Sequence, residues 1–110
     1  MKGDRLGEFE ELTLLAVLAL GDGAYGVVVQ ETIEREAARE VSLGAVYAAL
    51  ERMERKGLLR SGMSDATPER GGKRRRLFEV TPAGLRTVRE SRRAREALWN
   101  AAPRTLRGRP

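Results

Sequence analysis

The pattern of apolar and polar positions along the chain predicts four helices and one β-hairpin. Residues 8–20 begin with an acidic turn and continue as a run that is apolar on most sides, which indicates a helix at the centre of a core. Gly21-Asp22-Gly23 interrupts this run, and a second helix is predicted over residues 26–38. A short link leads from there into a third helix. Two helices followed by a short turn and a third helix is the order of a helix-turn-helix.

The third helix has two faces of different character. Ser42 is predicted to cap its start, and Gly57 suits the left-handed position just past its end. With an advance of about 100° per residue, one face is apolar and carries Leu43, Val46, Leu50 and Met53. The opposite face starts with small residues and becomes basic, and it carries Gly44, Ala45, Ala48, Arg52 and Arg55. Tyr47 lies at the flank.

The small-to-basic face fits an approach to the major groove of DNA. A helix in that groove presents its N-terminal part to the base edges, where small side chains let the backbone come close. Arginines further along the helix can reach phosphates or guanine. An ordinary surface helix with solvated arginines has the same composition, so this face taken alone leaves both interpretations open.

A β-hairpin with a basic tip is predicted after the third helix. Residues 58–63 and 75–81 have the composition of strands, and the loop between them, 64–72, is rich in turn-forming residues. The loop is followed by a basic run that consists of Lys73, Arg74, Arg75 and Arg76. Such a hairpin corresponds to the wing of a winged helix-turn-helix, whose basic residues bind phosphates or the minor groove. For the basic run alone, a flexible solvated turn is the alternative.

The last helix is predicted to start at Pro82, with Thr81 as its cap, and to run to about Asn100. It is very polar, and the apolar side chains that it offers are Leu85, Val88, Ala94, Leu98 and Trp99. A long helix with so few apolar side chains is hard to hold against its own domain. Pairing with a second copy of the chain is therefore expected.

These elements predict a fold that is mainly α with a small β-hairpin, a winged helix-turn-helix followed by a dimerisation helix. The expected organisation is a DNA-binding domain over residues 1–81, a C-terminal dimerisation helix over 82–102 and a basic disordered tail over 103–110.

The charge of the chain is divided unevenly between its two halves. Residues 1–50 carry four basic and nine acidic groups, whereas residues 51–110 carry seventeen basic and seven acidic ones. A concentration of positive charge in one half is typical of proteins that bind nucleic acid. It would also suit an acidic membrane surface, but no basic helix here has the bulky apolar opposite face that binding to a membrane surface favours. We expect double-stranded DNA as the partner, and no membrane.

Composition also limits the chemistry. The chain has 110 residues, which suits one domain, and it contains neither cysteine nor histidine. Disulfides, thiolate nucleophiles and zinc–cysteine sites are excluded, as is the commonest general base. The acidic residues show no paired arrangement, so we expect no enzymatic activity, no cofactor and no metal. The longest apolar run, 14–20, is too short for a membrane span, and no signal peptide is evident, so a cytoplasmic location is expected.

Several segments resemble the PadR family of bacterial transcriptional regulators. They are Leu6 to Leu18, Tyr25-Gly26, Val41 to Leu59, and Arg70 to Gly84. The likeness covers roughly residues 5–90, and Ser42 to Tyr47 together with Thr81 to Gly84 makes it specific. The single terminal helix is similar to that of the small branch of the family. The resemblance implies a homodimeric winged-helix protein, usually a repressor of adjacent genes, that binds a palindromic promoter site and dimerises through its last helix.

The resemblance also implies roles for single residues. By position, Ser42, Gly44, Tyr47, Lys73 and Arg74 would contact DNA, and Tyr25 would touch a phosphate. Together with the helix face and the basic run, the predicted DNA-binding residues are Tyr25, Ser42, Gly44, Ala45, Tyr47, Ala48, Arg52, Lys73, Arg74 and Arg75.

A small aromatic effector is a further implication of the resemblance. Some small members of the family bind flat aromatic compounds between the subunits with a tryptophan of the last helix. Trp99, the one tryptophan here, is the candidate, with Phe9 as a second effector-binding residue. The alternative for Trp99 is a packing anchor of the dimer interface.

A winged helix can also serve as a protein–protein interaction module without specific DNA binding, because fold does not fix function. The basic run at the wing argues against that alternative, since an interaction module has no need of it.

Overall fold

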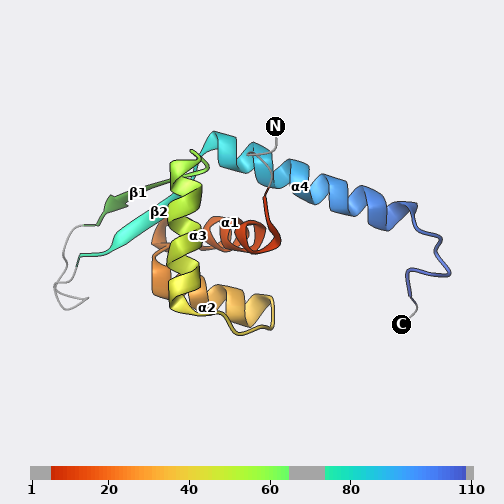
Figure 1. Ribbon diagram of the computed structural model, residues 1–110, viewed down its shortest axis with the longest axis horizontal. Helices are drawn as coiled ribbons and strands as arrows, with labels where there is room; N and C mark the ends of the chain where they lie inside the picture. The colour runs from red at the N-terminus through yellow and green to blue at the C-terminus, as the bar shows by residue number, and fades with distance from the viewer. Residues whose placement is uncertain (1–5, 65–73, 109–110) are drawn as a thin grey trace.

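The computed structural model describes residues 6–64 and 74–108. Its elements in chain order are α1 (Glu8–Leu20), the short 3-10 helix η2 (Gly21–Gly23), α2 (Gly26–Glu36), α3 (Leu43–Arg55), β1 (Leu59–Met63), β2 (Arg76–Val80) and α4 (Pro82–Ala101). The first three α-helices form one group, the β-hairpin extends from one side of it, and α4 projects on the other (Figure 1). The predicted fold class is confirmed: mainly helical, with one two-stranded antiparallel hairpin in the described part of the chain.

The elements lie where the sequence pattern predicts them, with one difference at the end of α2. That helix was expected to reach residue 38, but it ends at Glu36. The reason is Ala38, whose φ of 55° is left-handed and turns the chain toward α3. The other helices and both strands begin and end within one residue of their predicted bounds.

The core forms around α1, which contacts α2, α3, α4 and β2. Its largest fully buried side chains are Phe78, Leu14, Leu50, Met53, Leu59, Val17, Val29, Val46 and Val88. The backbone N–H of Phe78 donates to the carbonyl of Ala24 at 2.8 Å, so the segment after η2 lies beside β2, which pairs with β1. The central position predicted for residues 8–20 is confirmed.

A compact joint connects the end of α3 to the start of α4. Gly57 has a φ of 79°, and its carbonyl accepts a hydrogen bond of 2.6 Å from the Thr81 hydroxyl. The same hydroxyl accepts from the Gly84 N–H at 3.0 Å, which is the predicted cap of the last helix. A Cβ at Gly84 would collide with the Leu58 carbonyl oxygen, so only glycine permits this approach. The first turn of α4 is thereby fixed against the chain that leaves α3.

Beyond this joint α4 becomes exposed. Gly84 and Val88 are its buried residues, and every residue from 92 to 101 is exposed to solvent. The helix therefore extends away from the body, and the chain measures 56 × 35 × 21 Å (Figure 1). No helix within residues 6–64 and 74–108 is long and apolar enough to cross a membrane.

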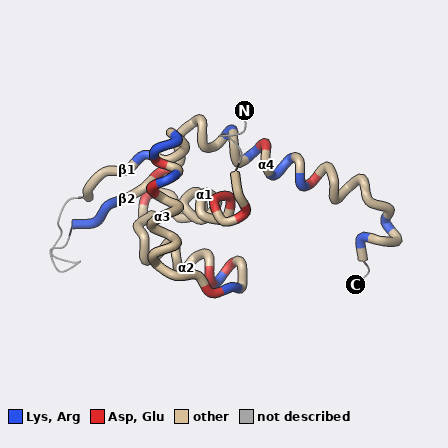
Figure 2. Tube along the Cα trace, viewed as in Figure 1, with Lys and Arg blue, Asp and Glu red and all other residues tan. Residues whose placement is uncertain are grey.

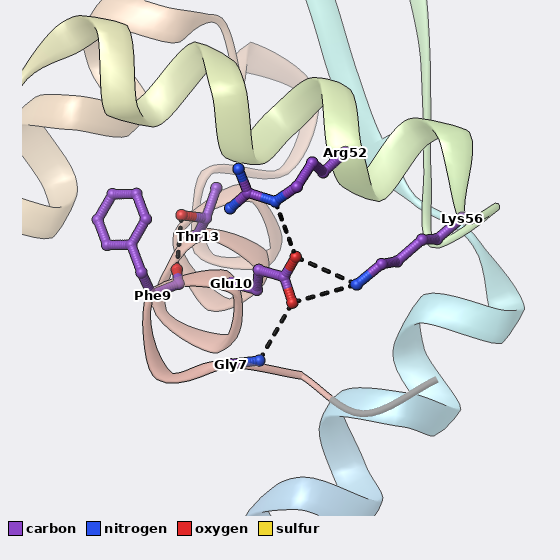
Figure 3. A network of polar contacts seen from close by, with 6 residues as sticks. All are labelled: Gly7, Phe9, Glu10, Thr13, Arg52 and Lys56. Atoms are coloured by element: carbon purple, nitrogen blue, oxygen red, sulfur yellow. Dashed lines mark hydrogen bonds and ion pairs between the residues drawn. The ribbon is translucent and has the colours of Figure 1, made fainter. Parts of the chain in front are cut away.

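Glu10, in the first turn of α1, is buried and holds the end of α3. Its carboxylate accepts from Arg52 Nε at 3.1 Å and from Lys56 Nζ at 3.2 Å, and it also accepts from the Gly7 N–H at 3.1 Å (Figure 3). Burial alone would raise the pKa of Glu10. The hydrogen bond from Gly7 and the two cations outweigh it, and they hold the pKa of this carboxyl below its ordinary value. The ionised form is the one that stabilises the contact between α1 and α3.

This pKa shift predicts a loss of stability in acid. Because the pKa of Glu10 is lower in the folded protein than in the unfolded chain, its ionisation adds to the free energy of unfolding at pH values above the unfolded-state pKa of about 4.3. This contribution disappears as the pH falls through the folded-state pKa. We expect the urea midpoint of the wild type to fall between about pH 5 and pH 3. Glu10→Gln should lower the free energy of unfolding at neutral pH by about 1.5–3 kcal/mol, because it removes hydrogen bonds to charged groups.

The same variant should also show a weaker dependence of the midpoint on pH than the wild type. Glu79→Gln is the matched control, since Glu79 forms an exposed pair with Arg60 on the hairpin, and we expect it to change stability by less than about 0.5 kcal/mol. An unchanged pH dependence in Glu10→Gln would contradict the role given to this carboxylate.

Candidate nucleic-acid interface

The exposed face of α3 has the composition that the helical pattern predicts. Val46, Leu50 and Met53 are fully buried against the core, and the small residues opposite them, Gly44, Ala45 and Ala48, are exposed. Ser42 caps the helix, because its hydroxyl accepts from the Ala45 N–H at 3.0 Å. The first two turns of α3 therefore present backbone and short side chains on this face, with the exposed Tyr47 at its flank.

Tyr47, at the flank of this face, packs against the start of α2. A Cβ at Gly26 would collide with the Tyr47 ring, so the glycine is what lets helix and ring meet. The ring remains 38% exposed. The sequence pattern does not predict this contact, although the pair Tyr25-Gly26 is a motif of the resemblance described above.

Arg75 and Tyr25 lie about 50 positions apart in the sequence and are brought together by the fold. The Arg75 guanidinium lies over the Tyr25 ring, 4.5 Å from its centroid, in a cation–π arrangement. Tyr25 is the N-cap residue of α2, and the Arg75 backbone N–H donates to Ser64 Oγ at 2.9 Å. The loop end of the hairpin therefore lies beside the start of α2.

The other described arginines of the predicted wing, Arg74 and Arg76, differ in the groups that they contact. Arg74 is exposed, and its Nε donates to the Ser64 carbonyl at 3.2 Å. Lys73, also predicted to bind DNA, lies outside the described residues. Arg76 is directed back to α3, where it pairs with Glu54 at 2.6 Å and with Glu51 at 3.6 Å.

The pairing of Arg76 fixes the hairpin against α3. Ser61 of β1 adds a hydrogen bond of 2.8 Å to Glu54, and this bond, together with Arg76, outweighs burial and lowers the pKa of Glu54. The charge of Arg76 is thus paired within the protein, although its side chain stays 42% exposed. Arg74 is exposed and Arg75 is half-buried over the Tyr25 ring, and neither forms an ion pair among the described residues. The sequence offers no signal for this distinction within a run of identical residues.

Arg52, the predicted contact furthest along α3, lies at the flank that faces α1. Its Nε is bound to Glu10, and its side chain is partly exposed. Arg55, one turn further, is exposed and has no ion pair among the described residues. Basic residues recur along α4 with acidic ones between them, and acidic residues also gather at the first turn of α1 and, beside basic ones, at the end of α2 (Figure 2).

The two predicted effector-binding residues lie in different surroundings. Phe9 is half-buried in the first turn of α1, and the guanidinium of Arg39 lies 5.8 Å from its ring centroid. Trp99 projects from the exposed half of α4 with 54% of its surface accessible. A pocket for a flat ligand is therefore not formed around Trp99 by the described residues of one chain.

Comparisons with known proteins agree with this geometry. A family model described as the transcriptional regulator PadR-like family matches residues 14–90. No curated protein sequence matches the chain at a significant level.

Solved structures share the fold. A PadR-like transcriptional regulator from Bacillus cereus aligns with a TM-score of 0.73 and 20% identity, over 92% of this chain and 93% of that one. A PadR family transcription regulator from Clostridium difficile gives a TM-score of 0.69 and 25% identity, over 84% and 92%. The complex named hsRosR-S4 gives a TM-score of 0.69 and 22% identity, over 93% and 82%.

The family match includes α3, the hairpin and the first half of α4, and it spans most of the chain. The family consists of transcription regulators, not enzymes. The chain belongs to the PadR-like family of transcriptional regulators.

Proposed function

We propose that the protein is a homodimer that binds a two-fold symmetric site in double-stranded DNA and represses adjacent genes. The observation that carries this proposal is a surface formed by the start of α3, the start of α2 and the loop end of the hairpin, which we call the reading surface. It consists of the described residues Tyr25, Ser42, Gly44, Ala45, Tyr47, Ala48, Arg74 and Arg75. Residues 1–81 supply this surface, and residues 82–102 supply the contact between the two copies.

In this proposal the start of α3 enters the major groove. Its small residues let the backbone approach the base edges, and Ser42 and Tyr47 supply hydrogen-bonding groups there. Tyr25 and Arg75 lie beside the groove and bind phosphates, which position the helix without reading sequence. Arg74 and Lys73 continue the contact along the wing. Arg52 takes part with one of its N–H groups already bound to Glu10.

Exposed apolar surface supports the proposed dimer. On the outer half of α4, Leu98 is 76% exposed and Trp99 54%, which is unfavourable for a helix facing water on all sides. An apolar groove of about 280 Å³ lies between α1 and α2, and it is lined by Leu12, Leu15, Ala16, Ala19, Thr32, Ile33, Glu36 and Ala37. We propose that α4 of a second copy covers apolar surface of α1 and that the same contact buries Leu98 and Trp99.

An aromatic effector would act at this contact between copies. Trp99 of each copy would stack on a flat compound held between the subunits, with Phe9 as a second contact, and binding would release the DNA. A purely structural role for Trp99 in the dimer would leave its fluorescence unchanged by such compounds.

Arg75→Ala tests the proposed phosphate contact. We expect it to weaken binding to labelled DNA from upstream of the protein's own gene. It should also lower the slope of log affinity against log salt by about 1.8, because each of two copies loses one contact worth about 0.9. The measurement is fluorescence anisotropy at several salt concentrations with a scrambled duplex as competitor.

Arg60→Ala is the matched control for this measurement. It removes the same charge from the same hairpin, but its side chain pairs with Glu79 on the sheet face opposite Ser61 and Phe78, away from α3. The salt slope should stay at the wild-type value. Equal affinity of the wild type for the upstream and scrambled duplexes would contradict the proposal of specific binding. An absence of DNA binding at low salt would favour a protein partner.

Leu98→Asp tests the proposed dimer. Burying one leucine side chain contributes roughly 1.5–3 kcal/mol, and the symmetric contact contains two, so the dimer should weaken by about 100-fold or more. Sedimentation equilibrium measures the dissociation constant. Leu106→Asp is the control, because Leu106 is equally exposed but lies beyond the end of α4. Similar effects of both substitutions would speak against α4 as the interface.

A further inference from the structure

Two adjacent carboxylates in the first turn of α1 are directed to different helices. Glu10 is 7% exposed and Glu11 is 5% exposed, although both carry charge. Because neighbouring residues of a helix differ by about 100° in direction, the two side chains leave α1 toward different sides. Glu10 pairs with Arg52 and Lys56 at the end of α3, and Glu11 pairs with residues of α4.

Glu11 binds two groups on successive turns of α4. Ser91 Oγ donates to Glu11 Oε1 at 2.9 Å, and Arg95 Nε donates to the same oxygen at 2.8 Å. A buried carboxylate is strongly unfavourable when it is left unpaired, so these contacts hold α4 at a defined place beside α1. The Arg95 side chain itself is 60% exposed, so it reaches Glu11 from solvent and does not lie in the core.

Glu11 is the outer of two anchors for α4. The inner anchor is Gly84, packed on the Leu58 carbonyl. The two residues that Glu11 binds, Ser91 and Arg95, lie about 10 and 16 Å from Gly84 along a helix that rises about 1.5 Å per residue. Between Gly84 and Ser91 the buried side chain is Val88. Every residue of α4 beyond Ser91 is exposed, so the helix has little apolar packing to fix its direction once the outer anchor is lost.

We propose that Glu11, through Ser91 and Arg95, is a positioning residue that sets the direction of α4, and with it the separation of the two α3 helices in the dimer. Glu10 holds α3 to the same turn of α1, so this turn positions both helices. This role rests on the homodimer proposed above.

Because α4 is long, a small tilt would displace its far end by a distance that matters for DNA recognition. Trp99 lies about 22 Å from Gly84 along the helix, so a tilt of about 10° would displace it by about 4 Å. That displacement is as large as one base-pair step, about 3.4 Å. A carboxylate on α1 can therefore determine which spacing of half-sites the dimer accepts, even though it never touches DNA.

The distance between the two α3 helices tests this role directly. The chain has no cysteine, so Arg55→Cys places a single spin label on the exposed end of α3 in each protomer. Pulsed dipolar spectroscopy of the dimer then gives the distribution of distances between the labels. We expect a narrow distribution with the otherwise wild-type chain, and one that shifts or broadens by several ångströms with Glu11→Gln or Arg95→Met.

Glu79→Gln, which removes an exposed carboxylate of the hairpin, should leave the distribution narrow. If Glu11→Gln does not fold, Arg95→Met carries the test, because the exposed Arg95 side chain is absent from the core. A wild-type distribution in Arg95→Met would overturn the positioning role and leave the dimer intact. An absence of dipolar coupling between protomers in the wild type would overturn the dimer itself, and the positioning role with it.

Discussion

A charge buried in a protein has to be paired, and α1 buries two carboxylates within its first turn. Glu10 draws the end of α3 toward α1, and Glu11 draws the middle of α4 to the same place. The apolar core could tolerate some sliding of these helices, but charge-assisted hydrogen bonds of about 3 Å define their positions closely. The first turn of α1 thus positions two helices, α3, which we propose to read DNA, and α4, which we propose to join the two copies.

Pairing of charges also shapes the proposed DNA interface. The four basic residues at the wing do not act as one patch, because Arg76 forms ion pairs with Glu54 and Glu51 of α3. Its pairing fixes the hairpin to α3, while Arg75 stacks on Tyr25 and Arg74 faces outward. These contacts tie the loop end of the strands to α3 and to the start of α2.

Much of the fold could be predicted from the sequence because its signals are local. The caps at Ser42 and Thr81, the left-handed Gly57 and the apolar stripe of α3 each depend on residues a few positions apart, and the structure contains all of them. The acidic start of α1 complements the helix dipole, as its sequence predicts, but it also makes tertiary contacts. Glu10 and Glu11 bind residues of α3 and α4 that lie 42 and 84 positions further along the chain. The spacing of apolar residues in the sequence does not predict such distant contacts.

The candidate interface was predicted less completely for the same reason. The helix face followed from its periodicity, but the stacking of Arg75 on Tyr25 and the contact of Tyr47 with Gly26 depend on tertiary packing. The end of α2 was missed because Ala38 adopts a backbone conformation that alanine rarely takes. Contacts with a second copy lie beyond what one chain contains, and Trp99 is the residue whose role depends on them most.

The most direct test of the central claim is a nuclear magnetic resonance titration of the labelled protein with DNA from upstream of its own gene. Binding through the reading surface predicts that the largest amide shifts fall at the start of α3, at Tyr25 and at Arg74 and Arg75, with little change along the outer face of α4. Shifts confined to the exposed arginines of α4, such as Arg86, Arg89 and Arg93, with α3 unaffected, would contradict it.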